Sequence, residues 1–190
     1  MPLLWHDYEV IRTMDHTRKS LADVLDLESR RKIYDLVGQY AGYHMREIQR
    51  ASGMSFGMVS YHLSYLQKHR LIREEQDGNH LRYFPLTLDI RDERLLTLLR
   101  QRSVRNILLF IVAHEGCSHQ DIVSSVHLSP STTTWHLKKL LDNDIIRSER
   151  RGKYNAYLLN IPKESILSLL ITFRESFFDS LVDGFLELWE

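Results

Sequence analysis

One stretch of this chain is written twice, and that repetition is the strongest constraint on its fold. "MVSYHLSYLQKHRLI" (residues 58–72) returns as "TTTWHLKKLLDNDII" (residues 132–146). Shifting the sequence by 74 residues aligns 28–86 with 102–160 without a gap, and fourteen of the 59 aligned positions are identical. The period is longer than the roughly 20–50 residues of a solenoid unit, so we predict two domains of one fold.

The composition is typical of a soluble globular protein that works inside the cell. The 190 residues suffice for one or two cores, and 43% hydrophobic with 26% charged residues argues against disorder. A single cysteine excludes an internal disulfide and fits a reducing compartment. We find no secretion signal and no apolar run of 18 residues, so we expect a cytoplasmic protein without membrane contact.

The charge is distributed unevenly although the net charge is zero. Each repeat carries a net charge of +3: nine Lys and Arg against six Asp and Glu in 28–86, and eight against five in 102–160. The chain ends are acidic. Two basic blocks favour a polyanionic partner while the whole stays neutral.

Each repeat predicts the same order of elements. Residues 30–40 and 104–114 have the apolar spacing of a helix and are followed by Gly42 and Gly116. A short helix comes next, over 45–52 and 119–126. A third helix follows near 56–68 and 130–142, after Ser55 and Ser129 as N-caps. Two strands around a glycine turn then complete each copy.

Three helices and a hairpin of this order make a winged helix-turn-helix. The predicted fold class is therefore mainly α with small β-wings (α+β), as two tandem domains. We expect an N-terminal segment over 1–16, a first domain over 17–88, a second over 89–161 and a C-terminal amphipathic helix over 162–190.

The segment "GMSFGMVSYHLSYLQKHRLIREEQDGNHLRYFPL" resembles the third helix and wing of ArsR-like winged-helix regulators. The second copy is a weaker match, with Thr133 and Thr134 in place of an apolar-Ser pair. Two such units in one chain are similar to the tandem winged-helix transcription regulators common in archaea. The resemblance covers residues 20–160 and implies a nucleoid-associated regulator that binds double-stranded DNA.

The candidate DNA-contacting residues are those that face away from the predicted core of each third helix, or lie on the wings. Small hydroxyl side chains suit hydrogen bonds to base edges, and lysines and arginines suit phosphates. The candidates are Gly57, Ser60, Tyr61, Ser64, Tyr65, Asn79, Arg82, Ser131, Thr132, Thr134, Trp135, Lys138, Lys139, Arg151 and Lys153. The second wing is the more basic.

A protein-interaction scaffold is the alternative function. Winged helices also bind proteins, and Tyr61, Tyr65 and Trp135 could belong to such a surface. The sequence pI of 7.2 is below the value of roughly 9 expected of a strong nucleic-acid footprint. An enzyme is not indicated, because the sequence lacks a glycine-rich phosphate loop, a nucleophile elbow and an HExxH pair.

Two sets of histidines invite a chemical interpretation. His62 and His136 occupy one position in the two copies, but each precedes a core leucine, so we predict a structural role for both. His114, Cys117 and His119 in "AHEGCSH" form a weak candidate metal site. The paired cysteines usual in metal-sensing ArsR proteins are missing, so a plain turn is favoured and no cofactor is expected.

The C-terminal segment from residue 163 to 190 is the most apolar part of the chain. Its apolar residues recur at spacings of three and four, which predicts one amphipathic helix with a wide apolar face. Such a face would either cover the second domain or form a homodimer interface. We favour the homodimer; an effector, if one exists, is unknown.

Overall fold

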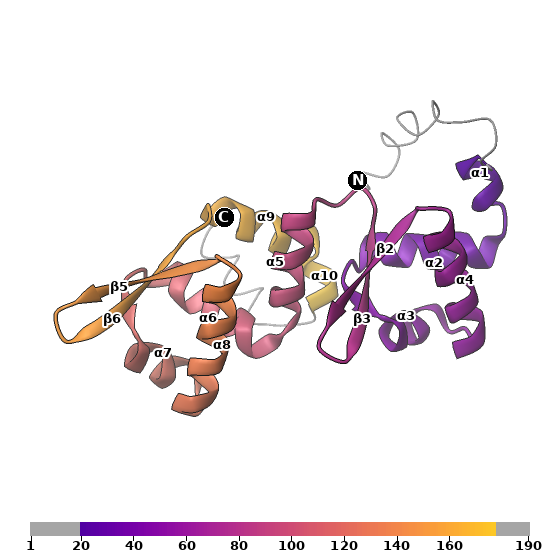
Figure 1. The fold of residues 1–190 in the computed structure, drawn as a ribbon. Coiled ribbons are helices and arrows are strands. Elements are labelled where there is room, and N and C mark those ends of the chain that lie inside the picture. The colour runs from indigo at the N-terminus through magenta and orange to yellow at the C-terminus, as the bar shows by residue number, and fades with distance from the viewer. Residues whose placement is uncertain (1–19, 178–190) are drawn as a thin grey trace. The chain divides into compact units, whose positions relative to one another are not determined.

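The computed structural model describes residues 20–177 and divides the chain into two compact units (Figure 1). The first unit contains the residues up to Gly38 together with Tyr43–Leu86. The second contains Gln39–Gly42 and the residues from Thr87 onward. The predicted N-terminal segment, residues 1–16, lies outside the described residues.

The first unit follows the predicted order of elements. Its helices are α1 (Leu21–Val24), α2 (Glu28–Gln39), α3 (Met45–Ser52) and α4 (Phe56–Lys68). Its strands are β1 (Tyr43–His44), β2 (Ile72–Asp77) and β3 (His80–Pro85). Ser55 begins α4 as predicted, because its hydroxyl accepts a hydrogen bond from the Met58 amide.

The second unit repeats this order with a longer first helix and adds two helices after its wing. It contains α5 (Ile90–Arg100), α6 (Arg102–Ala113), β4 (Cys117–Ser118), α7 (His119–Val126), α8 (Pro130–Asp142), β5 (Ile146–Arg151), β6 (Tyr154–Leu159), α9 (Lys163–Thr172) and α10 (Arg174–Phe177). Ser129 caps α8 through the Thr132 amide at 3.1 Å. The expected tandem winged helix-turn-helix fold is confirmed.

Each wing is a sheet of three strands, one more than the sequence predicts. The strand orders are β1-β3-β2 and β4-β6-β5, all antiparallel. The added strands are only two residues long, so they carry no alternating pattern that the sequence could reveal. They join the start of each helix-turn-helix to its wing.

The two copies also share their backbone geometry, position by position. Gly42 and Gly116 adopt φ of 84° and 86°, and the wing-turn glycines Gly78 and Gly152 adopt 60° and 58°. The Leu71 amide donates to the Leu66 carbonyl at 3.0 Å, and Ile145 repeats this bond with Leu140. The duplication therefore preserves the turn between the third helix and the wing.

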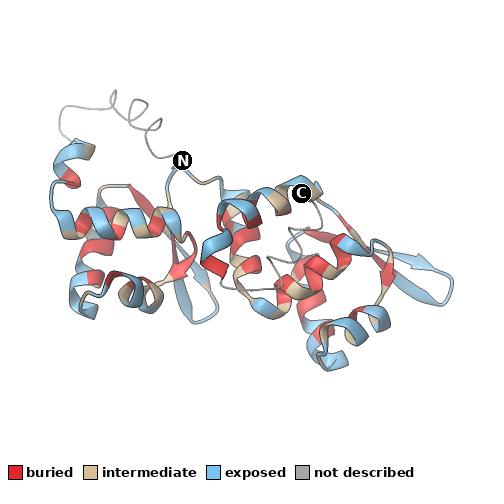
Figure 2. Ribbon diagram, turned by 180° about the vertical axis from the view of Figure 1, so that it is seen from behind, coloured by how far each residue is buried: buried red, intermediate tan, exposed pale blue. Residues whose placement is uncertain are grey.

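One stripe of the third helix of each repeat, α4 or α8, packs into the core of its unit. Val59, Leu63 and Leu66 are buried in α4, and Thr133, Leu137 and Leu140 are buried in α8. Figure 2 shows buried residues along one side of the helices of each unit, whereas the free ends of both hairpins are exposed. The predicted inward and outward faces of these helices are confirmed.

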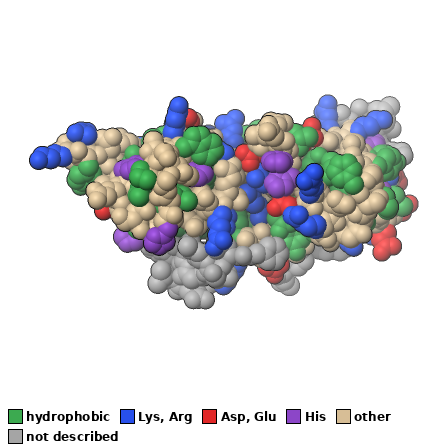
Figure 3. All heavy atoms as spheres, turned by 90° about the horizontal axis from the view of Figure 1, so that it is seen from below, with side chains coloured by type: hydrophobic (Ala, Val, Ile, Leu, Met, Phe, Trp, Pro, Cys, Tyr) green, Lys and Arg blue, Asp and Glu red, His purple; other side chains and the backbone are tan. Residues whose placement is uncertain are grey.

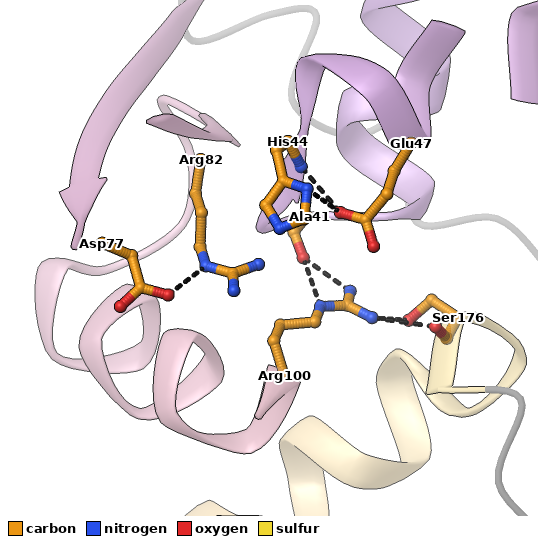
Figure 4. Close-up of polar contacts among 7 residues, drawn as sticks. All are labelled: Ala41, His44, Glu47, Asp77, Arg82, Arg100 and Ser176. Atoms are coloured by element: carbon orange, nitrogen blue, oxygen red, sulfur yellow. Dashed lines mark hydrogen bonds and ion pairs between the residues drawn. The ribbon is translucent and has the colours of Figure 1, made fainter. Parts of the chain in front are cut away.

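The C-terminal segment departs from the prediction of one continuous helix. α9 ends at Thr172 and a separate short α10 follows, because the chain leaves helical geometry at Phe173. Ile166, Leu169 and Leu170 are buried, and α9 packs against α5. Arg100 of α5 donates to the Ser176 hydroxyl at 2.7 Å (Figure 4).

This described part of the C-terminal segment therefore covers the core of its own unit. Residues 178–190 lie outside the described residues, and the homodimer interface remains a prediction. Within residues 20–177, each helix is too short or too polar to cross a bilayer.

Replacing Thr133 by valine is expected to stabilise the second unit by about 1 kcal/mol. The Thr133 side chain is fully buried, and among the residues described no group is placed to form a hydrogen bond with its Oγ1. A buried hydroxyl without a partner costs roughly 1–3 kcal/mol, and valine has nearly the same shape. Urea unfolding monitored by circular dichroism measures the change.

The first copy supplies the matched control for this substitution. Val59 occupies the equivalent position and is equally buried. Val59→Thr should therefore lower the stability of the first unit by a similar amount. Destabilisation by Thr133→Val would mean that the hydroxyl has a partner in solution.

Candidate nucleic-acid interface

The outward face of α8 carries hydroxyl and cationic groups. Opposite the buried stripe lie Ser131, Trp135 and Lys138, which follow one another at spacings of four and three residues. All three are exposed, and 60% of the Trp135 surface is accessible. Thr132 and Thr134 flank this row and are also exposed, while Lys139 is half-buried. This face matches the predicted set.

The outward face of α4 has the same geometry and different chemistry. Gly57, Tyr61 and Ser64 form its central row, with Ser60 and Tyr65 half-buried at the sides. The guanidinium of Arg30 stacks on the Tyr65 ring at 3.7 Å from the centroid, so this tyrosine also supports α2. Sequence reasoning had missed Phe56 and Met58, whose side chains are about half exposed at the start of the helix.

The second wing presents a cluster of cations at its free end. Arg150, Arg151 and Lys153 are exposed around the turn at Gly152. Figure 3 shows Lys and Arg side chains gathered at this end of the unit. The Arg151 guanidinium lies over Gly116, so that a side chain at Gly116 would meet its nitrogen at 3.0 Å. The basic character predicted for this wing is confirmed.

The first wing corrects one predicted contact residue. Arg82 was expected to face outward, yet only 6% of its surface is exposed. Its Nε donates to the Asp77 carboxylate at 2.8 Å, which holds the guanidinium along the sheet (Figure 4). Arg82 is therefore withdrawn from the candidate set. Asn79, at the turn, is exposed as predicted.

An open cavity of about 770 Å³ connects the helix-turn-helix of the second unit to its wing. Helix α7 contributes His119 and Gln120, and α8 contributes Thr134. The wing contributes Arg150, Lys153, Tyr154 and Asn155. Hydroxyl, amide and cationic groups thus line one groove between α8 and the wing, together with the Asp121 carboxylate on the α7 side. The Arg150 and Lys153 side of this groove suits a sugar-phosphate backbone.

The histidines of the third helices are structural, as predicted. His62 is buried and its Nε2 lies 3.1 Å from the Ser29 hydroxyl, which ties α4 to α2. Burial lowers the pKa of His62 from its ordinary value of 6.5, and the charge of Arg30 lowers it further. Burial likewise lowers the pKa of His136, with Lys139 as the second cause.

The weak candidate metal site is not assembled. His114 stacks on the Phe110 ring, and the His119 Nε2 lies 3.0 Å from the Thr134 hydroxyl. Cys117 is buried, and burial raises the pKa of its thiol to about 11, which disfavours the thiolate that binds metals. Within residues 20–177 no group of three or more His, Cys, Asp or Glu is placed to hold a metal ion.

Comparisons with known proteins agree with this architecture. Residues 27–96 match a family model described as an N-terminal HTH domain, and residues 100–147 match one described as winged helix-turn-helix DNA-binding. Such domains are binding modules and not enzymes. These two matches fall on the two copies of the repeat.

An uncharacterized HTH-type transcriptional regulator of Methanocaldococcus jannaschii is 34% identical over 146 residues, which is 76% of this chain. This chain spans only 36% of that protein's length. A protein of known structure from Corynebacterium diphtheriae aligns over 69% of this chain and 26% of its own, with 13% identity and a TM-score of 0.29.

The lowered pKa values of His62 and His136 predict that the protein loses stability in mild acid. In the unfolded chain each histidine has the higher pKa, so below about pH 6.5 the unfolded state binds more protons. The stability that these two histidines contribute should therefore be fully present above this pH. It should be lost as the pH drops toward their pKa values in the folded protein. The free energy of unfolding, measured by urea at pH 7.5 and 5.5, tests this.

A pair of variants identifies the histidines responsible. His62→Gln with His136→Gln should reduce the loss of stability between the two pH values. His127→Asn is the control: this histidine is exposed, and asparagine tolerates its left-handed backbone. An unchanged pH dependence in the double variant would assign the effect to other groups.

Proposed function

We propose that this chain, a protein of two tandem winged helix-turn-helix domains, is a transcription regulator that binds double-stranded DNA. One observation carries the proposal. In the second unit Thr134 of α8 and the cations Arg150 and Lys153 of the wing border one open groove. A third helix that enters the major groove beside a basic wing needs this arrangement.

Sequence would be read by the outward face of α8. Base pairs in the major groove each present a distinct pattern of donors and acceptors. Ser131 and Thr132 supply short hydroxyl side chains, which hydrogen-bond the Ser129 hydroxyl in the absence of DNA. The Thr134 hydroxyl donates to the Pro130 carbonyl, so it would act towards a base as an acceptor. Because these hydroxyls emerge from a helix whose other face is packed, their positions are fixed before DNA arrives.

Phosphates would be held by the wing and by the groove behind it. Arg150 and Lys153 lie on opposite sides of the Gly152 turn, and both line the cavity. Cations at these positions release condensed counterions from DNA, so they raise affinity without selecting a sequence. The second domain therefore supplies most of the affinity in this proposal.

The protein-interaction scaffold remains the second candidate function. The observation that favours it is the exposure of Phe56, Met58 and Tyr61 on α4, since apolar reading faces are also suited to protein partners. This surface belongs to the first unit, and the basic groove of the second unit has no role in such a scaffold. DNA binding accounts for the groove as well.

Three finer expectations accompany the proposal. A regulator of this kind would reside with the nucleoid in the cytoplasm. Homodimerisation through the C-terminal helix and membership of the ArsR-like group remain predictions from the sequence. Light scattering on the purified protein tests homodimerisation directly, because it measures the molar mass.

The experiment converts the second wing into the first at two matched positions. Arg150→Gln with Lys153→Asn installs the residues that occupy positions 76 and 79. The dissociation constant for a pool of ~30-bp duplexes is measured by fluorescence anisotropy over several salt concentrations. Two lost phosphate contacts should reduce the slope of log K against log salt by roughly 2.

The matched control removes two cations from a helix outside both wings. Arg91 and Arg94 are exposed on α5, so Arg91→Gln with Arg94→Gln changes the net charge equally. This control should keep the wild-type slope. An equal change of slope in both variants would mean that the wing acts only through the overall charge of the protein. Absence of DNA binding at low salt would support the protein-interaction scaffold.

A further inference from the structure

The duplication allows the two reading faces to be compared residue by residue. After the shift of 74 residues the sequence of α4 aligns with that of α8 without a gap, and each helix has a serine N-cap. Their buried stripes are alike except that Thr133 stands where the first copy has Val59. The outward positions differ at nearly every step, so the divergence lies in what each helix would touch.

The N-terminal part of α4 exposes three large apolar side chains beside Gly57 and Ser64, and it carries no charge. Phe56, Met58 and Tyr61 expose 54%, 46% and 59% of their surfaces, and the helix carries no Lys or Arg before Lys68. The matched positions in α8 hold Pro130, Thr132 and Trp135. Among the groups in the major groove, the C5-methyl of thymine is the one that gains from apolar contact.

The face of α8 instead carries a cation in its central row. Lys138 lies nearly opposite the buried stripe, in line with Ser131 and Trp135. The matched residue of α4 is Ser64. A lysine on the groove side of a reading helix suits guanine, whose O6 and N7 are adjacent acceptors. Lys139, further round the helix, is placed for a phosphate.

The two domains also hold cations on different elements. The second unit has them on its wing, as described above. The first unit has Arg46 and Arg50 exposed on α3, opposite the buried Ile48 and Ser52. The matched residues of α7 are Gln120 and Ser124. Each domain thus has an element with exposed cations that suit phosphates, so the acidic strand β2 does not exclude DNA binding by the first domain.

We infer that the two domains read different half-sites: α4 reads a thymine-rich one through Phe56, Met58 and Tyr61, and α8 reads a guanine-containing one through Lys138. The operator is then asymmetric, although the protein is an internal repeat. This inference rests on the proposed function and deepens it. It assigns the base chemistry that each helix selects.

The first step of the test is selection from a random duplex library with the full chain. The expected consensus contains one A·T-rich element and one element with guanine, not two copies of one element. Thymines of the first element are then replaced by deoxyuridine, which removes only the methyl. Each methyl that α4 buries should contribute about fourfold to affinity, from roughly 0.8 kcal/mol per buried carbon.

Guanines of the second element are replaced by 7-deazaguanine, which removes the N7 acceptor. Loss of one charge-assisted hydrogen bond should weaken binding about tenfold or more. Two exposed-face variants then connect each effect to its helix. Phe56→Ala with Met58→Thr should reduce the deoxyuridine effect alone, with Tyr61 left in place, and Lys138→Ser should abolish the 7-deazaguanine effect alone.

The outcomes separate this inference from the function on which it rests. If the protein binds no duplex, the proposed function fails. If it binds duplexes but selects a direct repeat, the inference is overturned and the regulator survives. If α4 variants leave the consensus and the deoxyuridine effect unchanged, α4 does not read thymine, and its apolar face is left for a protein partner.

Discussion

The burial of one stripe of the third helix determines most of what this protein presents to its surroundings. Leu63 and Leu66 in the first unit, and Leu137 and Leu140 in the second, are almost completely excluded from water. Each such side chain contributes roughly 1.5–3 kcal/mol, so rotation of the helix about its axis would be costly. The outward residues are therefore held in fixed positions, although none of them packs in the core.

Sequence reasoning succeeded where a periodic apolar pattern existed and failed where a single contact decided the outcome. The helices, hairpins and inward stripes follow from spacing and from the serine caps. Arg82 shows the limit: its position on the wing predicts exposure, but a carboxylate five residues away in the chain draws it along the sheet. The break at Phe173 was similarly invisible, because apolar residues continue at helical spacing beyond it.

The two copies share internal hydrogen bonds and turn geometry but differ in their surface residues. Arg31 donates to the Leu25 carbonyl, and Arg105 repeats this bond with the Leu99 carbonyl. The turn before each wing has a left-handed backbone at the same position, Arg70 in the first copy and Asp144 in the second, although neither residue is glycine. These internal bonds are common to both copies, while outward positions differ, as at Ser64 and its counterpart Lys138. Surface chemistry was free to diverge because the core carries the stability.

The short connection between the repeats has a consequence for how DNA would be occupied. Only residues 86–89 separate β3 from α5. Once one domain is bound to its half-site, the other is confined near the same duplex at a high effective concentration, in the millimolar range for short tethers. Two DNA-binding domains in one polypeptide would then bind together without prior association of subunits. Occupancy of an operator by one chain would rise with the first power of protein concentration, whereas binding as the predicted homodimer would make the response to expression level steeper.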